Sequence, residues 1–363
     1  MRCGRNIHAD EGLTTINHGN TECRLGENAM LKQHSGSLSR RSMLRATAFA
    51  GAAAMGLFPR GARAANYPVR PVKIIVPFAP AGPTDIMARF VAANLGNAIG
   101  GTVIVENRAG AGGNIGIGIA AHSEADGYTL LVTSSAYVVN PSLYAKIPYD
   151  PYNDFTPIAE LGTSPNVFLV DPKTGITSIE ELVARAKADP NLLNYSSPGV
   201  GTTPHLSAEL LKIEAGMNMT HLPFPGAGPA IQAILSGTVQ VCSAALPPAH
   251  PHIESGALRA LAVTGASRWF DLPNVPTMVE VGYKDFIADT FHGFLAPAKT
   301  PPEIVQLLAA KTIAVLKDQK LAEQLRNNGF EVIAKGPEGM QKRITDEVPK
   351  WRDIVAKAGI KPV

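Results

Sequence analysis

The sequence predicts an α/β protein with two lobes and a ligand cleft between them. Three observations favour this class. Strand-like and helix-like segments alternate after residue 64, glycine-containing loops open several of the helices, and the second half repeats the strand–loop–helix pattern of the first. Two lobes that present such loops to each other form a clamshell, which closes by a hinge around a small molecule.

The first 64 residues have the features of an export leader. Arg40 and Arg41 precede the apolar run Ala46–Phe58, and Ala62–Ala64 is a cleavage site of the A-x-A type. This arrangement resembles a twin-arginine export signal, so we expect cleavage after Ala64 and a mature protein in the periplasm. The polar segment before Met30 lies upstream of the usual signal architecture, which makes Met30 a candidate start codon.

The charge balance argues against a nucleic-acid-binding protein, and the positions of the cysteines exclude an intrachain disulfide in the mature chain. Nine of the 33 basic residues but only four of the 30 acidic residues precede residue 65, so the mature chain has a net charge of −2. Without a basic stripe we expect no nucleic-acid partner. Cys3 and Cys23 lie in the leader, which leaves Cys242 without a disulfide partner. Its apolar surroundings predict a core residue and not a reactive thiol.

The first strand–loop–helix unit of the mature chain has the clearest sequence signals. The apolar run that ends at Val76 predicts a buried strand, and Gly82 with Pro83 predicts the N-cap and first position of a helix. No Lys or Arg lies between Pro77 and Asp85. The free amides of this helix start therefore suit a carboxylate better than a polyphosphate, with an ordinary capped helix as the alternative.

The next two units complete the first region. A strand at Thr102–Glu106 leads into the glycine loop Gly110–Gly116. A dinucleotide fingerprint is absent, because its third glycine would fall on Ile115. A third strand, Tyr128–Val132, is followed by hydroxyl residues at Thr133–Ala136. Ligands bind at this edge of open α/β sheets, although a hydroxyl-rich helix cap is equally consistent.

The second region repeats this pattern. Its expected elements are the strand Asn166–Val170, the helix Ile179–Ala188, the strand Leu192–Ser196, the loop Ser197–Thr202, a helix from Thr203 to Gly216, a helix Ala230–Leu235 after Gly226, and strands within Val239–Leu246 and Leu258–Val263. The segment Phe291–Pro297 returns the chain to the first lobe, where helices start at Pro302, Gln319 and Pro337. We expect lobe 1 at 65–169 with 291–363 and lobe 2 at 170–290.

Signals for catalysis and metal binding are weak. The chain has no G-x-S-x-G motif for a serine hydrolase. His250-Pro251-His252 fits no helical metal-ligand spacing, and no H-E-x-x-H motif or cysteine pair accompanies it. We therefore expect no catalytic residue, no metal and no cofactor.

Several separated motifs carry a family resemblance through their order and spacing: Val76–Ala79 with Pro83–Asp85, Glu106–Arg108 with Gly112–Gly116, Asp126–Leu130, Asn140-Pro141, Asp154-Phe155, Ser197–Leu206 and Leu272–Thr277. From about Tyr67 to Pro362 the chain resembles the solute receptors of tripartite tricarboxylate transporters, also called Bug-type periplasmic binding proteins. The resemblance implies a type II periplasmic binding protein fold and no catalysis. It also implies delivery of a small carboxylate to the membrane permease subunits of such a transporter. We expect the receptor to be a monomer.

The resemblance places the carboxylates of the ligand on the first strand–helix loop and on the Ser/Gly loop of the other lobe. The expected ligand-binding residues are Phe78, Ala81, Gly82, Thr84 and Asp85 on one side, Ser197, Gly201, Thr202, Thr203 and His205 on the other, and Ser134 and Ser135 at the base.

Three departures from the family pattern bear on the ligand. Ala81 replaces a glycine, Phe224-Pro225-Gly226 replaces Tyr-Lys-Gly, and His292 replaces an aromatic residue. Together they favour a ligand less polar than citrate, such as an aromatic or short monocarboxylate. An exported α/β enzyme acting on a small carboxylate, or an orphan sensory receptor, is the alternative.

Overall fold

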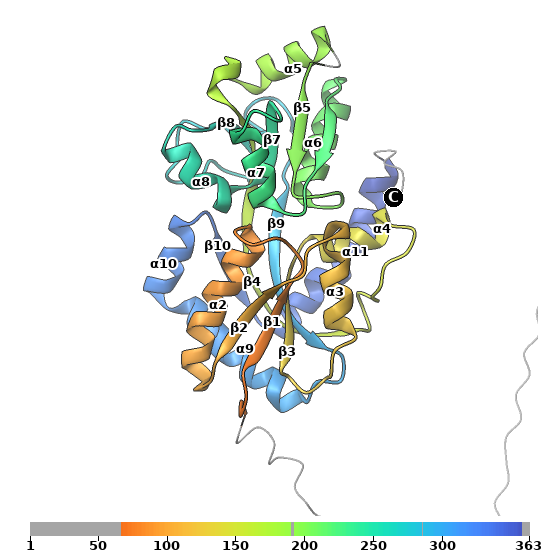
Figure 1. Ribbon diagram of the computed structural model, residues 1–363, viewed down its shortest axis with the longest axis vertical. Coiled ribbons are helices and arrows are strands. Elements are labelled where there is room, and N and C mark those ends of the chain that lie inside the picture. Colours follow the sequence, from red (N-terminus) through yellow and green to blue (C-terminus); the bar gives the residue numbers. More distant parts are fainter. Residues whose placement is uncertain (1–66, 190–191, 285, 358–363) are drawn as a thin grey trace, which may run out of the picture. The chain divides into compact units, whose positions relative to one another are not determined.

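Two groups of strands joined by one long strand organise the structure, a computed structural model that describes residues 67–189, 192–284 and 286–357 (Figure 1). The expected export signal, its cleavage site and Met30 all lie outside the described residues. None of the helices in the described part combines the length and the apolar character needed to cross a bilayer.

The first group has the strand order β2-β1-β3-β9-β4, with β10 also paired to β4. β1 is parallel to β2 and β3, whereas β9 is antiparallel to β3 and β4. Its strands are β1 (Val72–Val76), β2 (Val103–Asn107), β3 (Thr129–Ser134), β9 (Asp289–Pro297), β10 (Glu331–Lys335) and the first part of β4 (Phe155–Val170).

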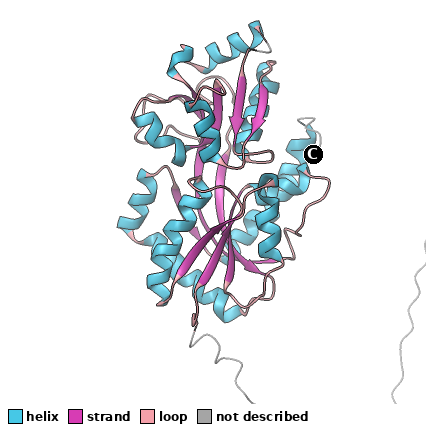
Figure 2. Ribbon diagram, in the orientation of Figure 1, coloured by secondary structure: helices cyan, strands magenta, loops and turns pink. Residues whose placement is uncertain are grey.

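Helices cover both faces of this group (Figure 2). One face packs against α2 (Pro83–Ile99), α9 (Pro302–Lys317) and α10 (Gln319–Asn327), and the other against α3 (Asn114–Ala121), α4 (Ala136–Leu143) and α11 (Pro337–Lys357). Alternation along the strands produces the two cores. Ile74 and Val76 enter the first core and Ile75 enters the second, because successive side chains of a strand point to opposite faces.

The second group contains the last part of β4 with β5 (Asn194–Ser197), β6 (Thr220–Pro223), β7 (Val241–Ala245) and β8 (Arg259–Val263). The helices α5 (Ile179–Ala188) and α6 (Thr203–Ala215) contribute to one core, and α7 (Ala227–Leu235) and α8 (Leu246–Glu254) to the other. The described residues also contain two short 3₁₀ helices, η4 (Ala111–Gly113) and η5 (Pro172–Thr174). Cys242 is fully buried, and burial raises the pKa of its thiol to about 12, which confirms the predicted core residue.

The strand β4 belongs to both groups. Up to Pro165 it pairs with β9, and from Asn166 it pairs with β7. The expected strand Asn166–Val170 was therefore too short. Pro157 and Pro165 argue against a central strand, but the structure accommodates a bulge in the pairing just after Pro157. The lobe boundaries given above remain a prediction.

Local signals gave several helix boundaries correctly, although α7 begins at Ala227 and not at the expected Ala230, and α4 and α8 had no prediction. The helix α2 begins at Pro83 after the N-cap Gly82, α5 spans the expected residues, and α6 ends at Gly216 in a left-handed conformation. The short strands β6 and β10 had no prediction. β6 has only four residues, and β10 is interrupted by a register shift against β4.

Candidate functional site

Several helix starts surround one cavity. The helices α2, α6 and α7 each begin directly after a loop that follows a strand, and residues at these starts line the cavity together with Ser134 at the end of β3 and Ala245, the N-cap of α8. The first turn of a helix leaves backbone N–H groups without intrahelical partners. Such groups attract anions through their hydrogens and through the partial positive charge of the helix end.

The start of α2 is held by its own first turn. Asp85 accepts hydrogen bonds from Ala81 N at 2.9 Å, from Arg89 Nε at 2.9 Å and from Asn107 Nδ2 at 2.9 Å. Asn107 also donates to the Phe78 carbonyl at 3.0 Å. Ala81 has φ +63°, a left-handed conformation that favours glycine, so these bonds offset local strain. Asp85 therefore shapes the loop and is absent from the cavity lining.

The start of α6 has a different support. Thr202 is the N-cap, and its hydroxyl donates to the Gly199 carbonyl at 2.7 Å. Behind this loop the imidazoles of His205 and His221 stack with their centroids 4.4 Å apart. Burial lowers the pKa of His205 to about 4 and that of His221 to about 3, so both rings are neutral at pH 7. The hydroxyl of Ser197 lies 2.7 Å from His221 Nε2, which fixes the base of the loop.

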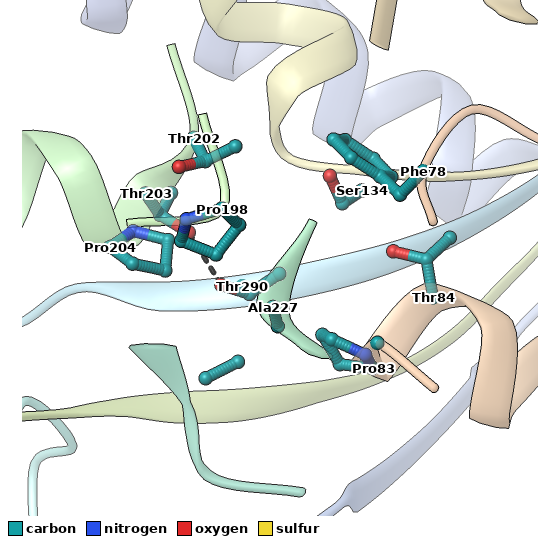
Figure 3. A pocket seen from close by; sticks show the side chains of 12 residues that line it. Phe78, Pro83, Thr84, Ser134, Pro198, Thr202, Thr203, Pro204, Ala227 and Thr290 are labelled. Atoms are coloured by element: carbon teal, nitrogen blue, oxygen red, sulfur yellow. Dashed lines mark hydrogen bonds between the residues drawn. The ribbon is translucent and has the colours of Figure 1, made fainter. Parts of the chain in front are cut away.

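The cavity encloses about 360 Å³, counting the part open to solvent. Figure 3 shows Phe78, Pro83 and Thr84 on one side and Pro198, Thr202 and Thr203 facing them. None of its lining residues carries a charged side chain; they are Phe78, Gly82, Pro83, Thr84, Ser134, Pro198, Thr202, Thr203, Pro204, Ala227, Ala245 and Thr290.

The hydroxyl groups of the cavity are not equivalent. The Thr290 hydroxyl donates its one hydrogen to Asn166 Oδ1 at 2.9 Å. In the hydrogen bond between Thr203 and Thr290 the donor is therefore the Thr203 hydroxyl. The Thr202 hydroxyl already donates its hydrogen to the Gly199 carbonyl. Within the described ranges, the hydroxyl hydrogens of Thr84 and Ser134 have no acceptor in the protein. The donors available to an anion therefore concentrate at the start of α2 and the end of β3.

Six of the twelve expected site residues line the cavity: Phe78, Gly82, Thr84, Ser134, Thr202 and Thr203. The other six are absent from its lining: Ala81, Asp85, Ser135, Ser197, Gly201 and His205. Ser135, for example, accepts a hydrogen bond from the Phe291 N–H at 2.9 Å and so attaches the start of α4 to β9.

Sequence reasoning missed Thr290, Ala245 and the prolines of the lining. Pro83 and Pro204 had a signal, since both occupy a first helical turn. Thr290 had none, because it lies in β9, remote in sequence from every loop of the site.

His292 does not line the cavity, which corrects its expected effect on the polarity of the ligand site. It is fully buried, its ring packs edge-on against Phe330, and neither ring nitrogen has a hydrogen-bond partner among the described residues. Burial lowers its pKa to about 3. The described residues also contain no cluster of three or more acidic, histidine or cysteine side chains suited to a metal ion.

A two-lobed α/β fold with uncharged donors around a cavity defines a solute-binding receptor of the periplasmic type. The chain belongs to the tripartite tricarboxylate transporter receptor family, which matches residues 87–360. This membership confirms the expected family and fold class. It also confirms the expectation that the protein is a receptor and not an enzyme.

Individual relatives agree with this assignment. The chain is 38% identical to protein BugT of Bordetella pertussis over 298 residues, covering 82% of this chain and 91% of that protein. The structure of the periplasmic binding protein BugD matches with a TM-score of 0.80 and 35% identity, covering 82% of this chain and 100% of that chain. The R. palustris protein Rpa4515, solved with adipate, matches with a TM-score of 0.79 and 34% identity, covering 82% and 100%.

Proposed function

We propose that this receptor captures a small carboxylate in the cavity described above. Its carboxylate accepts hydrogen bonds from the first-turn amides of α2 and from the hydroxyls of Thr84 and Ser134. The supporting observation is that these unpaired donors face a cavity without a charged side chain. Neutral donors can hold one delocalised negative charge, and the dipole of α2 adds to their effect.

The twelve expected residues divide into two roles in this proposal. Thr84, Ser134, Gly82 and Phe78 contact the ligand, together with Thr202 and Thr203. Ala81, Asp85, Ser135, Ser197, Gly201 and His205 keep the two loops in shape. The adipate bound to Rpa4515 supports a carboxylate as the ligand class.

Capture requires the two lobes, 65–169 with 291–363 and 170–290, to close over the ligand. Two hydrogen bonds between these segments support a closed form: Ala79 N donates to Pro225 O at 3.1 Å, and Tyr144 Oη donates to Val200 O at 3.2 Å. The closed receptor then delivers the solute to the membrane permease subunits of a tripartite tricarboxylate transporter. We place this step in the periplasm, after twin-arginine export of the monomer and removal of residues 1–64.

The experiment is a binding titration of residues 65–363 with short carboxylates, followed by thermal unfolding with each acid. A ligand present at a hundredfold its dissociation constant stabilises the protein by about 2.7 kcal/mol. Thr84→Val keeps the shape of the side chain but removes one donor to the anion. We expect binding to weaken about 10- to 100-fold, as for a lost hydrogen bond to a charged group.

Thr345→Val is the matched control, because Thr345 is exposed on α11, away from the cavity. Its affinity should equal that of the unchanged protein. Failure of every acid to bind, or equal affinity of the Thr84→Val variant and its control, contradicts the proposal. Conversion of the acid into another compound would favour an enzyme.

A further inference from the structure

A second cavity adjoins the first. It encloses about 560 Å³, counting the part open to solvent, and it shares Phe78 and Pro198 with the first cavity. These two side chains therefore form the partition between the cavities. The remaining lining residues are Gly110, Ala111, Gly112, Gly113, Tyr144, Gly199, Val200, Pro223, Phe224 and Pro225.

The lining of the second cavity is aromatic and apolar. Phe78, Tyr144 and Phe224 supply rings, and no charged side chain lines it. The Tyr144 hydroxyl donates to the Val200 carbonyl at 3.2 Å, and burial raises the pKa of this phenol, so it remains neutral. Glycines and prolines make up most of the rest, and they contribute no side-chain donor.

The unequal distribution of hydroxyl donors between the two cavities sets the orientation of the bound ligand. The unpaired hydroxyl donors, Thr84 and Ser134, are in the first cavity, whereas the second cavity has no hydroxyl apart from the committed Tyr144. A carboxylate therefore binds best at the start of α2, and whatever it carries extends past Phe78. A second carboxylate there would lose water and would find neither a cation nor an unpaired hydroxyl, only backbone amides of the glycine loop, so it would bind less well than one at the start of α2.

We propose that the second cavity is the subsite for the distal part of the ligand, and that the preferred ligand is a monocarboxylate with an apolar tail the size of an aryl group. This inference rests on the proposed function, since it needs the carboxylate in the first cavity. Each methylene that enters an apolar site tightens binding about fourfold, and a ring adds stacking on the aromatic side chains.

The test compares butanoate, 4-phenylbutanoate and adipate in titrations of residues 65–363. The three acids share a four-carbon or longer chain and differ in the distal group: none, a ring or a second carboxylate. We expect 4-phenylbutanoate to bind at least about tenfold more tightly than butanoate, and more tightly than adipate. Tighter binding of adipate than of 4-phenylbutanoate overturns the inference while leaving a carboxylate receptor intact.

Variants locate the effect in the second cavity. Phe224→Ala should weaken 4-phenylbutanoate about tenfold and leave butanoate unchanged, and Tyr152→Ala, an exposed aromatic residue outside both cavities, should change neither. Pro225→Lys adds an ammonium group to the lining and should shift the preference toward adipate. An equal loss for butanoate and 4-phenylbutanoate in Phe224→Ala overturns the subsite, and absence of binding by all three acids overturns both proposals.

Discussion

Replacement of Gly112 by alanine separates backbone strain from closure of the two lobes. Gly112 has φ +61°, and a Cβ atom there would lie 2.3 Å from the Val200 carbonyl oxygen and 2.6 Å from Tyr144 Oη. Val200 belongs to the second strand–helix region, so the clash with its carbonyl arises only when the lobes are closed, whereas the Tyr144 hydroxyl lies in the same lobe as Gly112 at the end of a side chain that can rotate away. The left-handed strain of an alanine, about 1 kcal/mol, is present whether they are open or closed.

The two effects therefore appear in different measurements. Strain lowers the free energy of unfolding by about 1 kcal/mol without changing affinity. The clash displaces a backbone carbonyl and breaks the hydrogen bond between Tyr144 and Val200, which destabilises the closed form by about 1–2 kcal/mol. If binding requires closure, the affinity falls about 5- to 30-fold.

Gly216→Ala is the matched control. Gly216 has φ +60°, and an added Cβ there would meet nothing within 4 Å. Both variants should lose similar stability in urea unfolding, and only Gly112→Ala should lose affinity for butanoate, which is too short to need the second cavity. Unchanged binding by Gly112→Ala, or an equal loss of binding by the control, would refute the role of this contact in closure.

Three further predictions concern single contacts. Tyr144→Phe removes the hydrogen bond to Val200, so titration should show butanoate binding weakened about 2- to 10-fold with little change in unfolding. Asp85→Asn removes the charge and replaces one of the two acceptor oxygens with an NH2 donor, so the bonds that hold the first loop cannot all form and urea unfolding should show a loss of about 1–3 kcal/mol. His292 has its pKa lowered to about 3 in the folded protein against about 6.5 in the unfolded chain, so the unfolded chain binds more protons between these values and the free energy of unfolding decreases as the pH is lowered from 7. His292→Phe should therefore gain roughly 2 kcal/mol relative to the unchanged protein between pH 7 and pH 5, measured by urea unfolding at both values.

A specific result would contradict each of these three predictions. Equal affinity of Tyr144→Phe and the unchanged protein would mean that the bond forms in the open state too. Asp85→Asn should be compared with Asp346→Asn, an exposed ion-pair partner of Lys342, and equal losses would exclude a special role for Asp85. A constant stability difference between His292→Phe and the unchanged protein from pH 7 to pH 5 would show that His292 titrates normally.

The helix starts were predictable because their signals are local. Gly82 with Pro83, and Thr202 ahead of Pro204, specify where α2 and α6 begin whatever the rest of the chain does. The same signals predicted the loops that line the first cavity. They did not show which way a side chain points, so Asp85, which is turned toward Ala81 and Arg89, was expected beside the ligand.

The remaining features depend on contacts between distant segments. The long strand β4 was truncated in the prediction because its prolines are tolerated only beside the bulge and pairing that β9 provides. Thr290 reaches the cavity through its position in β9, and the second cavity combines Tyr144 with Phe224, residues from different regions. No window of the sequence contains these combinations, so local patterns cannot predict them.

The absence of charged side chains from the lining of the first cavity also affects how salt acts on this receptor. Cations placed around a cleft would steer an anion toward it, and mobile ions would screen that attraction. In the proposed complex the anion meets amides and hydroxyls at short range, where mobile ions screen little. Association should therefore proceed at an unsteered rate, and affinity should change little with ionic strength. A receptor of this kind can work in an exterior compartment whose salt content follows the surroundings of the cell.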